Sequence, residues 1–126
     1  MDTAPKSKKD LKREYQNAPR RAGVYKIENR RNGRVLLGSA RNVHGPLNSH
    51  RFQLNLGTHR NAELQRDWRE HGADAFVFEV LEELVVREGD PDFSLDDELG
   101  KLEARWIARL EPFGERGYNR PPLERD

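Results

Sequence analysis

The stretch AGVYKIENRRNGRVLLGSA, residues 22–40, decides the fold. Two short runs, AGVYKIEN and GRVLLGSA, stand on either side of RRNG, and Val24, Tyr25 and Ile27 of the first and Val35 of the second are β-branched or aromatic side chains. Such side chains favour strands, and an Asn-Gly pair between two such runs is the strongest local hairpin signal, because both residues tolerate positive φ. The stretch therefore predicts a β-hairpin, with strands near 23–28 and 34–38.

The pattern turns helical after the hairpin. Val43, Leu47 and Leu54 fall on one face of a helix that Gly57 should end. The pair Gly45-Pro46 predicts that the regular helix begins at Pro46, because proline is suited to the first helical position. The sequence thus indicates a first helix over 46–56.

The rest of the chain alternates in type. Leu64 and Trp68 lie one turn apart in a second helix over 60–71, which Gly72 caps. The run AFVFEVLEEL alternates apolar and polar residues, as a third strand over 76–82 would. Ser94 can cap a third helix over 95–110. With a short N-terminal helix over 8–18, these elements predict an α+β fold: a three-stranded antiparallel sheet flanked by helices.

Length and composition bound the possibilities. At 126 residues the chain suits one domain, here divided into a basic arm (1–21), the folded domain (22–120) and a frayed tail (121–126). It has no cysteine, which excludes disulfides and thiolate metal sites and agrees with a cytoplasmic location. No apolar run approaches the roughly 20 residues of a membrane span, and the N-terminus lacks an apolar secretion signal.

The net charge of +1 hides an asymmetry. Residues 1–75 hold 16 basic and 8 acidic side chains, whereas residues 76–126 hold 7 and 14. A basic surface is the expected footprint of a nucleic-acid site, because Lys and Arg bind the phosphate backbone. The alternative is that both charge runs are merely solvated faces.

Glu103 is the anomaly of the third predicted helix. At roughly 100° per residue it falls inside the apolar arc, between Leu99 and Ile107. A carboxylate there needs a cation, a hydrogen bond or a metal, because burying an unpaired carboxylate costs on the order of several kcal/mol. An arginine partner, or a side chain that reaches the rim of the core, is the structural alternative to metal binding.

The landmarks along the chain come in a familiar order. Together they resemble the GIY-YIG nuclease family, most closely the nuclease domain of homing endonucleases, while NAPRRAGVY resembles the entry to that domain in the excision-repair nuclease. The resemblance covers about 23–119. The landmarks are GVY at 23–25, LLGSA at 36–40, His50, GTHRNAELQRDWREHG at 57–72, Glu103, Trp106 and Tyr118-Asn119.

The resemblance implies metal-dependent hydrolysis of a phosphodiester on a three-stranded antiparallel sheet with helices. In the family, a first tyrosine acts as general base or positions the attacking water, and a second tyrosine supports it. An arginine on the first helix stabilises the phosphate, and a glutamate on the third helix binds Mg²⁺ or Mn²⁺. Metal and guanidinium neutralise the charge of the phosphate while water attacks.

Carried over to this chain, Tyr25 matches the first tyrosine and Glu103 the metal-binding glutamate. Asn119 matches an asparagine that braces the site, although a Tyr-Asn pair is also an ordinary turn. His50 and His59 match positions that often hold histidine, and a purely structural role for both rings is equally compatible with the sequence.

Two departures bear on activity. Leu36 stands where the family has its second tyrosine, and Pro46 stands where it has its arginine. Leucine has no proton to give or take. Arg51 lies about 140° around the helix from Pro46 and cannot simply replace the arginine, which leaves Arg41 or His44 in the preceding loop as a rescue.

Three functional hypotheses follow. The first is a nucleic-acid-binding, catalytically impaired nuclease domain; the sequence does not decide between DNA and RNA, and DNA is the favoured ligand. The second is an active endonuclease with relocated catalytic groups, and the third is a scaffold that binds a protein partner, or a second copy, through its acidic C-terminal half. The expected nucleic-acid-binding residues are Arg30, Arg31, Arg34, Arg41, Arg51 and Arg60.

Overall fold

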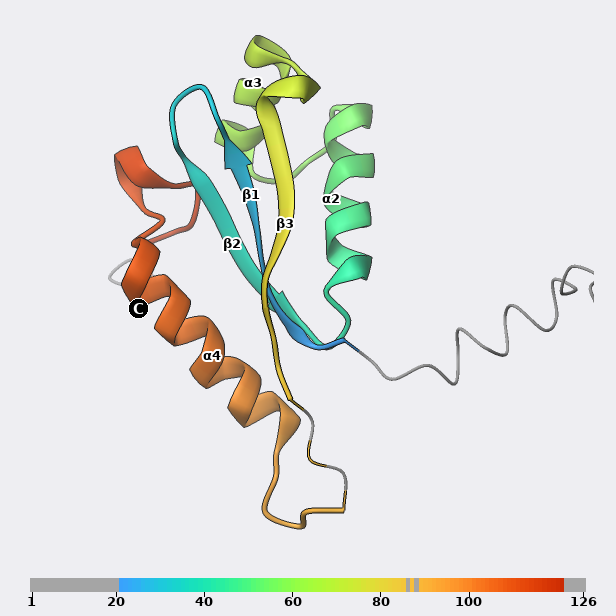
Figure 1. Ribbon diagram of the computed structural model, residues 1–126. Helices are drawn as coiled ribbons and strands as arrows, with labels where there is room; N and C mark the ends of the chain where they lie inside the picture. The colour runs from blue at the N-terminus through green and yellow to red at the C-terminus, as the bar shows by residue number, and fades with distance from the viewer. Residues whose placement is uncertain (1–20, 86, 88, 122–126) are drawn as a thin grey trace, which may run out of the picture.

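The protein's architecture comes from a computed structural model that describes residues 21–85, 87 and 89–121 (Figure 1). The expected N-terminal helix over 8–18 and nearly all of the tail lie outside these residues. No helix in the described ranges is long and apolar enough to cross a membrane. The elements are β1 (Gly23–Asn29), β2 (Val35–Ala40), α2 (His44–Leu56), α3 (Ala62–His71), β3 (Phe76–Glu83) and α4 (Leu95–Leu110), with 3-10 turns at Ala73–Ala75 and Gly114–Arg116.

The three strands form one antiparallel sheet in the order β2-β1-β3. The central strand β1 pairs with both others, so that Tyr25 lies opposite Gly38 on β2 and Val80 on β3. This arrangement confirms the predicted α+β class.

The sheet is covered by helices on both faces, as Figure 1 shows. On one face Ile27 packs with Leu54 of α2 and with Leu64 and Trp68 of α3. On the other face Val24 packs with α4, where Leu102 is 1% exposed. Alternate residues of β1 thus enter two separate apolar clusters, because successive strand side chains point to opposite faces.

The hairpin prediction is confirmed, but its turn differs from the expected one. Only Gly33 has positive φ (77°), whereas Asn32 keeps a negative φ. The loop spans more than two residues, with Gly33 N donating to Asn29 O (2.7 Å) and Asn29 N donating to Arg34 O (2.9 Å). Asn32 contributes through its side chain instead, because its Oδ1 accepts from the Arg34 amide at 2.9 Å.

The helix boundaries depart from the sequence only at their starts. The first helix begins at His44 rather than at Pro46. Pro46 is accepted in its first turn because an N–H there has no intrahelical partner. The second begins at Ala62, after the Asn61 side chain accepts from Leu64 N. The third matches its predicted range, and Ser94 caps it as expected.

A buried polar network ties three distant segments together. Asp67 of α3 is 4% exposed. Its Oδ2 accepts from Tyr118 Oη (2.7 Å) and from Asn32 Nδ2 (3.2 Å). Tyr118 Oη in turn accepts from Asn29 Nδ2 at 3.1 Å. Burial raises the pKa of Asp67, but the hydrogen bonds from Tyr118 and Asn32 and the charge of Arg34 outweigh it, so that the pKa is lowered overall.

The segment after α4 covers the outer edge of β2. Tyr118 N donates to Val35 O at 2.9 Å. The Asn119 side chain pairs with the backbone of Leu37, accepting from its N–H at 2.8 Å and donating to its carbonyl at 2.9 Å. An edge strand left bare would offer these groups to another chain, so the segment both completes and protects the sheet.

We expect Tyr118→Phe to destabilise the protein by about 1 to 3 kcal/mol, because it removes a donor from buried Asp67 and leaves Asn29 Nδ2 without an acceptor. Urea unfolding measures the change. Thr58→Val, which removes an exposed hydroxyl, should stay within about 0.5 kcal/mol of the wild type. Equal stabilities for Tyr118→Phe and the wild type would contradict the role of the network.

Candidate functional site

Tyr25 lies on the α2 face of the sheet and is 7% exposed. Its Oη is 2.9 Å from Nε2 of His50 on α2. A Cβ placed on Gly38 would stand 2.5 Å from the Tyr25 oxygen. The missing side chain at position 38 is therefore what leaves room for the phenol beside β2.

Two histidines continue from Tyr25 in a hydrogen-bonded chain. Nδ1 of His50 is 2.8 Å from Nε2 of His59, and the Asn61 backbone N–H donates to Nδ1 of His59 at 3.0 Å. Since His59 Nδ1 accepts, the proton of the neutral ring is on Nε2 and is donated to His50 Nδ1. His50 then carries its proton on Nε2 and donates it to Tyr25 Oη.

The chain of rings is neutral near pH 7. Burial, then the charges of His59 and Arg60, lower the pKa of His50 to about 4. Burial and Arg60 also lower the pKa of His59. Burial and the Glu103 carboxylate raise the pKa of Tyr25, and Arg60 opposes them. Tyr25 is therefore a phenol whose oxygen accepts from His50 and whose own proton is free to be donated.

The loop that carries His59 is held at both ends. Gly57 ends α2 with φ 79°. Buried Gln65 accepts from His59 N at 3.0 Å and donates to Leu54 O at 3.1 Å. Asn61 caps α3 and also donates from Nδ2 to Tyr118 O at 2.9 Å. These contacts fix residues 57–61 between the two helices.

Two cavities adjoin Tyr25 and share Tyr25, His50 and Arg60 among their lining residues. The larger has a volume of about 690 Å³. Pro46 lines this larger cavity, and Leu36 lines the smaller one. Both positions at which the sequence departs from the family pattern therefore face the space beside Tyr25.

Glu103 lies on α4, which covers the opposite face of the sheet from α2. Its side chain is half-buried, and within the described part of the chain no cation or donor pairs with it. Of the two structural alternatives to metal binding, an arginine partner is not found among the described residues, whereas the half-buried position agrees with a side chain that reaches the rim of the core. The carboxylate raises the pKa of Tyr25, yet it lines neither cavity, so that the convergence of Tyr25 and Glu103 on one cleft stays a prediction.

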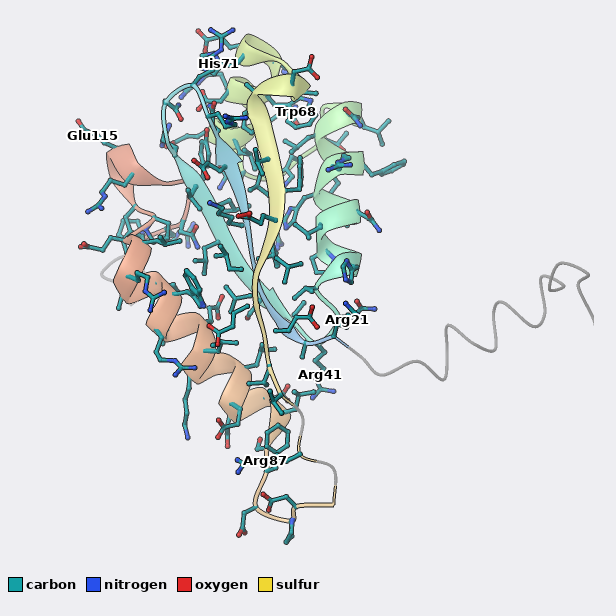
Figure 2. The ribbon with its side chains drawn as sticks, viewed as in Figure 1. Arg21, Arg41, Trp68, His71, Arg87 and Glu115 are labelled. Carbon is teal, nitrogen blue, oxygen red and sulfur yellow. The ribbon has the colours of Figure 1, made fainter. Side chains whose placement is uncertain are left out.

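The proposed rescue groups, Arg41 and His44, are not among the residues that line these cavities. The Arg41 guanidinium binds Asp96 through Nε (2.9 Å) and Nη2 (2.6 Å), and Figure 2 shows Arg41 near the first turn of α4. His44 is exposed, and it is not a lining residue although Gly45 and Pro46 are.

The other arginines expected to bind nucleic acid divide into two groups. Arg34 is engaged by Glu63 and Asp67 and lies over the Tyr118 ring, and Arg51 lies 4.4 Å over the ring of Phe78. Arg30, Arg31 and Arg60 are exposed, and no described carboxylate forms an ion pair with them.

A second group of metal-ligand type occurs at the end of α3. Atoms of Asp67, Glu70 and His71 lie within 4.8 Å of one another. Asp67 is already engaged by Tyr118 and Asn32. Of the three residues, Asp67 belongs to the buried network and Glu70 is exposed, and none of them lines the Tyr25 cavities.

Two residues of the site were not singled out from the sequence. Asn61 carried a usable signal, because asparagine directly before a helical run is a preferred N-cap. Gln65 carried none: a glutamine within a helix is ordinary, and its role depends on Leu54 and His59 lying on either side of it.

Comparison with known proteins gives consistent relatives. No family model matches the chain. The protein is 34% identical to intron-associated endonuclease 1 of Enterobacteria phage T4 over 64 residues, which make up 51% of this chain and 26% of that protein. The chain thus corresponds to about a quarter of the curated relative.

Solved structures agree over a larger share. The catalytic domain of homing endonuclease I-TevI superposes with a TM-score of 0.62 at 30% identity, covering 79% of this chain and 98% of that domain. A mutant of the same domain gives a TM-score of 0.61 at 29% identity over 92% of its length. Because the likeness spans nearly all of a catalytic domain in both fold and sequence, and GVY and LLG occupy paired strands, this chain belongs to the GIY-YIG nuclease family.

Proposed function

We propose that this protein binds the backbone of nucleic acid, DNA in preference to RNA, at the Tyr25 cavities and hydrolyses it at a strongly reduced rate. The observation that carries the proposal is the position of Leu36 and Pro46, which line those cavities. The family pattern has a tyrosine and an arginine there. The names of the relatives, all endonucleases, support nucleic acid as the ligand.

The reduced rate follows from what the two side chains lack. Leucine at 36 cannot hydrogen-bond an attacking water, and proline at 46 cannot offset the charge of a phosphate. Removing a single preorganised group that stabilises the transition state costs on the order of 10² to 10³ in rate. The loss of two such groups leaves binding as the dominant property of the site.

The remaining polar groups retain defined tasks. Tyr25, held by His50, would donate its proton to a water or to a phosphate oxygen. His59 holds the His50 ring, and Asn119 braces the edge strand at Leu37. Since Tyr25 keeps its proton near neutral pH, it would orient water rather than act as a general base.

Glu103 fits a divalent cation. It is a half-buried carboxylate that no described residue satisfies, and Mg²⁺ is commonly held by one or two carboxylates together with substrate phosphates. This role requires the predicted convergence of Glu103 and Tyr25 on one cleft, where Mg²⁺ or Mn²⁺ held by the carboxylate would polarise the phosphodiester and neutralise part of its charge.

The two other hypotheses have narrower support. An endonuclease with relocated groups requires substitutes for both lost groups at the Tyr25 cavities; Arg41 is paired elsewhere, so that the charge would have to come from Arg60, which lines both cavities. A protein scaffold would use the acidic C-terminal half, but Asp96, Asp97 and Glu98 occupy the first turn of α4. Acidic residues in the first turn of a helix interact favourably with the helix dipole, so their presence is explained without a partner protein.

We expect the wild-type protein to bind a DNA duplex with strong salt dependence and to cleave plasmid and branched DNA negligibly with Mg²⁺ or Mn²⁺. The double variant Leu36→Tyr, Pro46→Arg should gain metal-dependent cleavage of roughly 10²-fold or more, because it restores a hydroxyl and a guanidinium beside Tyr25. Gel-based cleavage assays measure both.

Glu103→Ala in the double-variant background is the control and should abolish the gained cleavage. Robust cleavage by the wild type that Glu103→Ala abolishes would contradict the reduced rate and favour the active-endonuclease hypothesis. Absence of binding to DNA, with or without binding to RNA, would contradict the choice of DNA.

The neutral histidine pair predicts acid-sensitive stability. The pKa of His50 is lowered from the ordinary 6.5 to about 4, so the unfolded chain takes up this proton at a higher pH than the native state does. The stabilisation is complete above pH 6.5 and is lost as the pH falls through about 4. Thermal unfolding from pH 7 to pH 4 measures it.

The variant His50→Gln isolates this contribution. The difference in Tm between the wild type and His50→Gln should shrink as the pH falls, since only the wild type carries the unfavourable protonation. His44→Gln, which replaces an exposed ring, should follow the wild-type profile. Parallel profiles for the wild type and His50→Gln would disprove the neutral pair.

A further inference from the structure

Arg60 differs from most arginines of the described chain in having no partner. Arg41 binds Asp96, Arg116 binds Glu111, and Arg69 donates to the carbonyl of Gly57. No described residue forms a hydrogen bond, ion pair or ring contact with Arg60. It nevertheless lines both cavities at Tyr25.

The backbone beneath Arg60 is fixed. Both neighbouring residues are anchored through their backbone N–H groups. His59 N donates to the Gln65 side chain, and Asn61 N donates to the His59 ring. Asn61 also bonds α3 and the carbonyl of Tyr118. The Arg60 side chain therefore starts from a rigid point on the rim of the cavities, which lowers the entropy lost when it binds a ligand.

The chemistry of the cavities suits an anion. Neither cavity has a carboxylate among its lining residues, although the chain holds 22 acidic residues. The lining polar groups include the Tyr25 phenol, the hydroxyls of Ser49 and Thr58, and the Gln53 amide. A guanidinium together with neutral donors is the combination that binds phosphate oxygens.

The charge of Arg60 affects the pKa of each of the three rings of the site. It counts among the causes that lower the pKa of His50 and His59, after burial in both cases. It also opposes the rise in the pKa of Tyr25 that burial and Glu103 cause. Arg60 also shares its cavities with these rings, because Tyr25 and His50 line both cavities and His59 lines the smaller one.

We propose that Arg60, in the loop before α3, binds the phosphodiester at the Tyr25 cavities and so holds the nucleic acid at a site where Pro46 offers no guanidinium from α2. The assignment rests on the proposed function, in that the ligand is the backbone phosphate of nucleic acid. The guanidinium of Arg60 comes from a loop rather than from a helix, and Arg60 lines the same cavity as Pro46.

The test compares Arg60→Ala with Arg105→Ala, a matched loss of one exposed arginine on α4. Binding of a fluorescent DNA duplex is measured over a range of salt concentrations. Arg60→Ala should bind roughly ten-fold more weakly at low salt, and its slope of log K against log salt should fall by about one. Arg105→Ala should leave both quantities near the wild-type values.

Two further measurements separate binding from folding and from general charge. Arg60→Lys keeps the charge but loses the planar fork, so it should bind with intermediate affinity. The Tm of Arg60→Ala should equal that of the wild type, because no described contact is lost. Equal weakening by Arg60→Ala and Arg105→Ala would show a general charge effect and overturn the assignment.

A failure to bind DNA would refute the proposed function but not the phosphate-binding role of Arg60. That role is therefore tested separately by a titration with inorganic phosphate. Phosphate should shift the NMR signals of the His50 and His59 rings in the wild type and in Arg105→Ala. In Arg60→Ala the shifts should be lost. Shifts that persist in Arg60→Ala, or that never occur in the wild type, would overturn the role of Arg60.

Discussion

The fold depends on satisfying one buried carboxylate. Asp67 is nearly inaccessible to solvent, and a bare charge there would cost several kcal/mol, on the order expected for an unpaired buried ion. Tyr118 and Asn32 donate to it, and Arg34 lies 3.7 Å away. These partners come from the hairpin turn and from the segment after α4. The hydrogen bonds and the ion pair of Asp67 therefore bring three distant parts of the chain together around one end of the sheet.

That arrangement leads directly to the site. With Tyr118 held by Asp67, Asn119 pairs with the Leu37 backbone and covers β2, while Asn61 bonds the Tyr118 carbonyl and fixes the loop before α3. The same loop delivers His59 and Arg60 to the cavities beside Tyr25. The buried network and the candidate site are therefore connected through these backbone and side-chain amide contacts.

Local patterns predicted much of this structure. The alternation in β3 and the spacing of apolar residues in α4 were sufficient for both elements, because two-residue and 3.6-residue periods indicate which face of a strand or helix is buried. The turn between β1 and β2 was harder. Asn-Gly suggested positive φ at both residues, yet Asn32 donates its side chain to Asp67 and keeps negative φ, a choice that depends on a partner 35 residues away.

The sequence by itself determined the order of strands and helices, the family resemblance, and the absence of a hydroxyl at Leu36 and of a charge at Pro46. Only the tertiary structure decided which arginines are free. Arg41 and Arg60 both lie in loops, and nothing in the sequence distinguishes them. In the structure Arg41 binds Asp96 on α4, whereas Arg60 lines a cavity that has no carboxylate among its lining residues. The physical reason is that periodicity specifies the face of a helix or strand, while the surroundings of a loop side chain are set by residues far away in the chain.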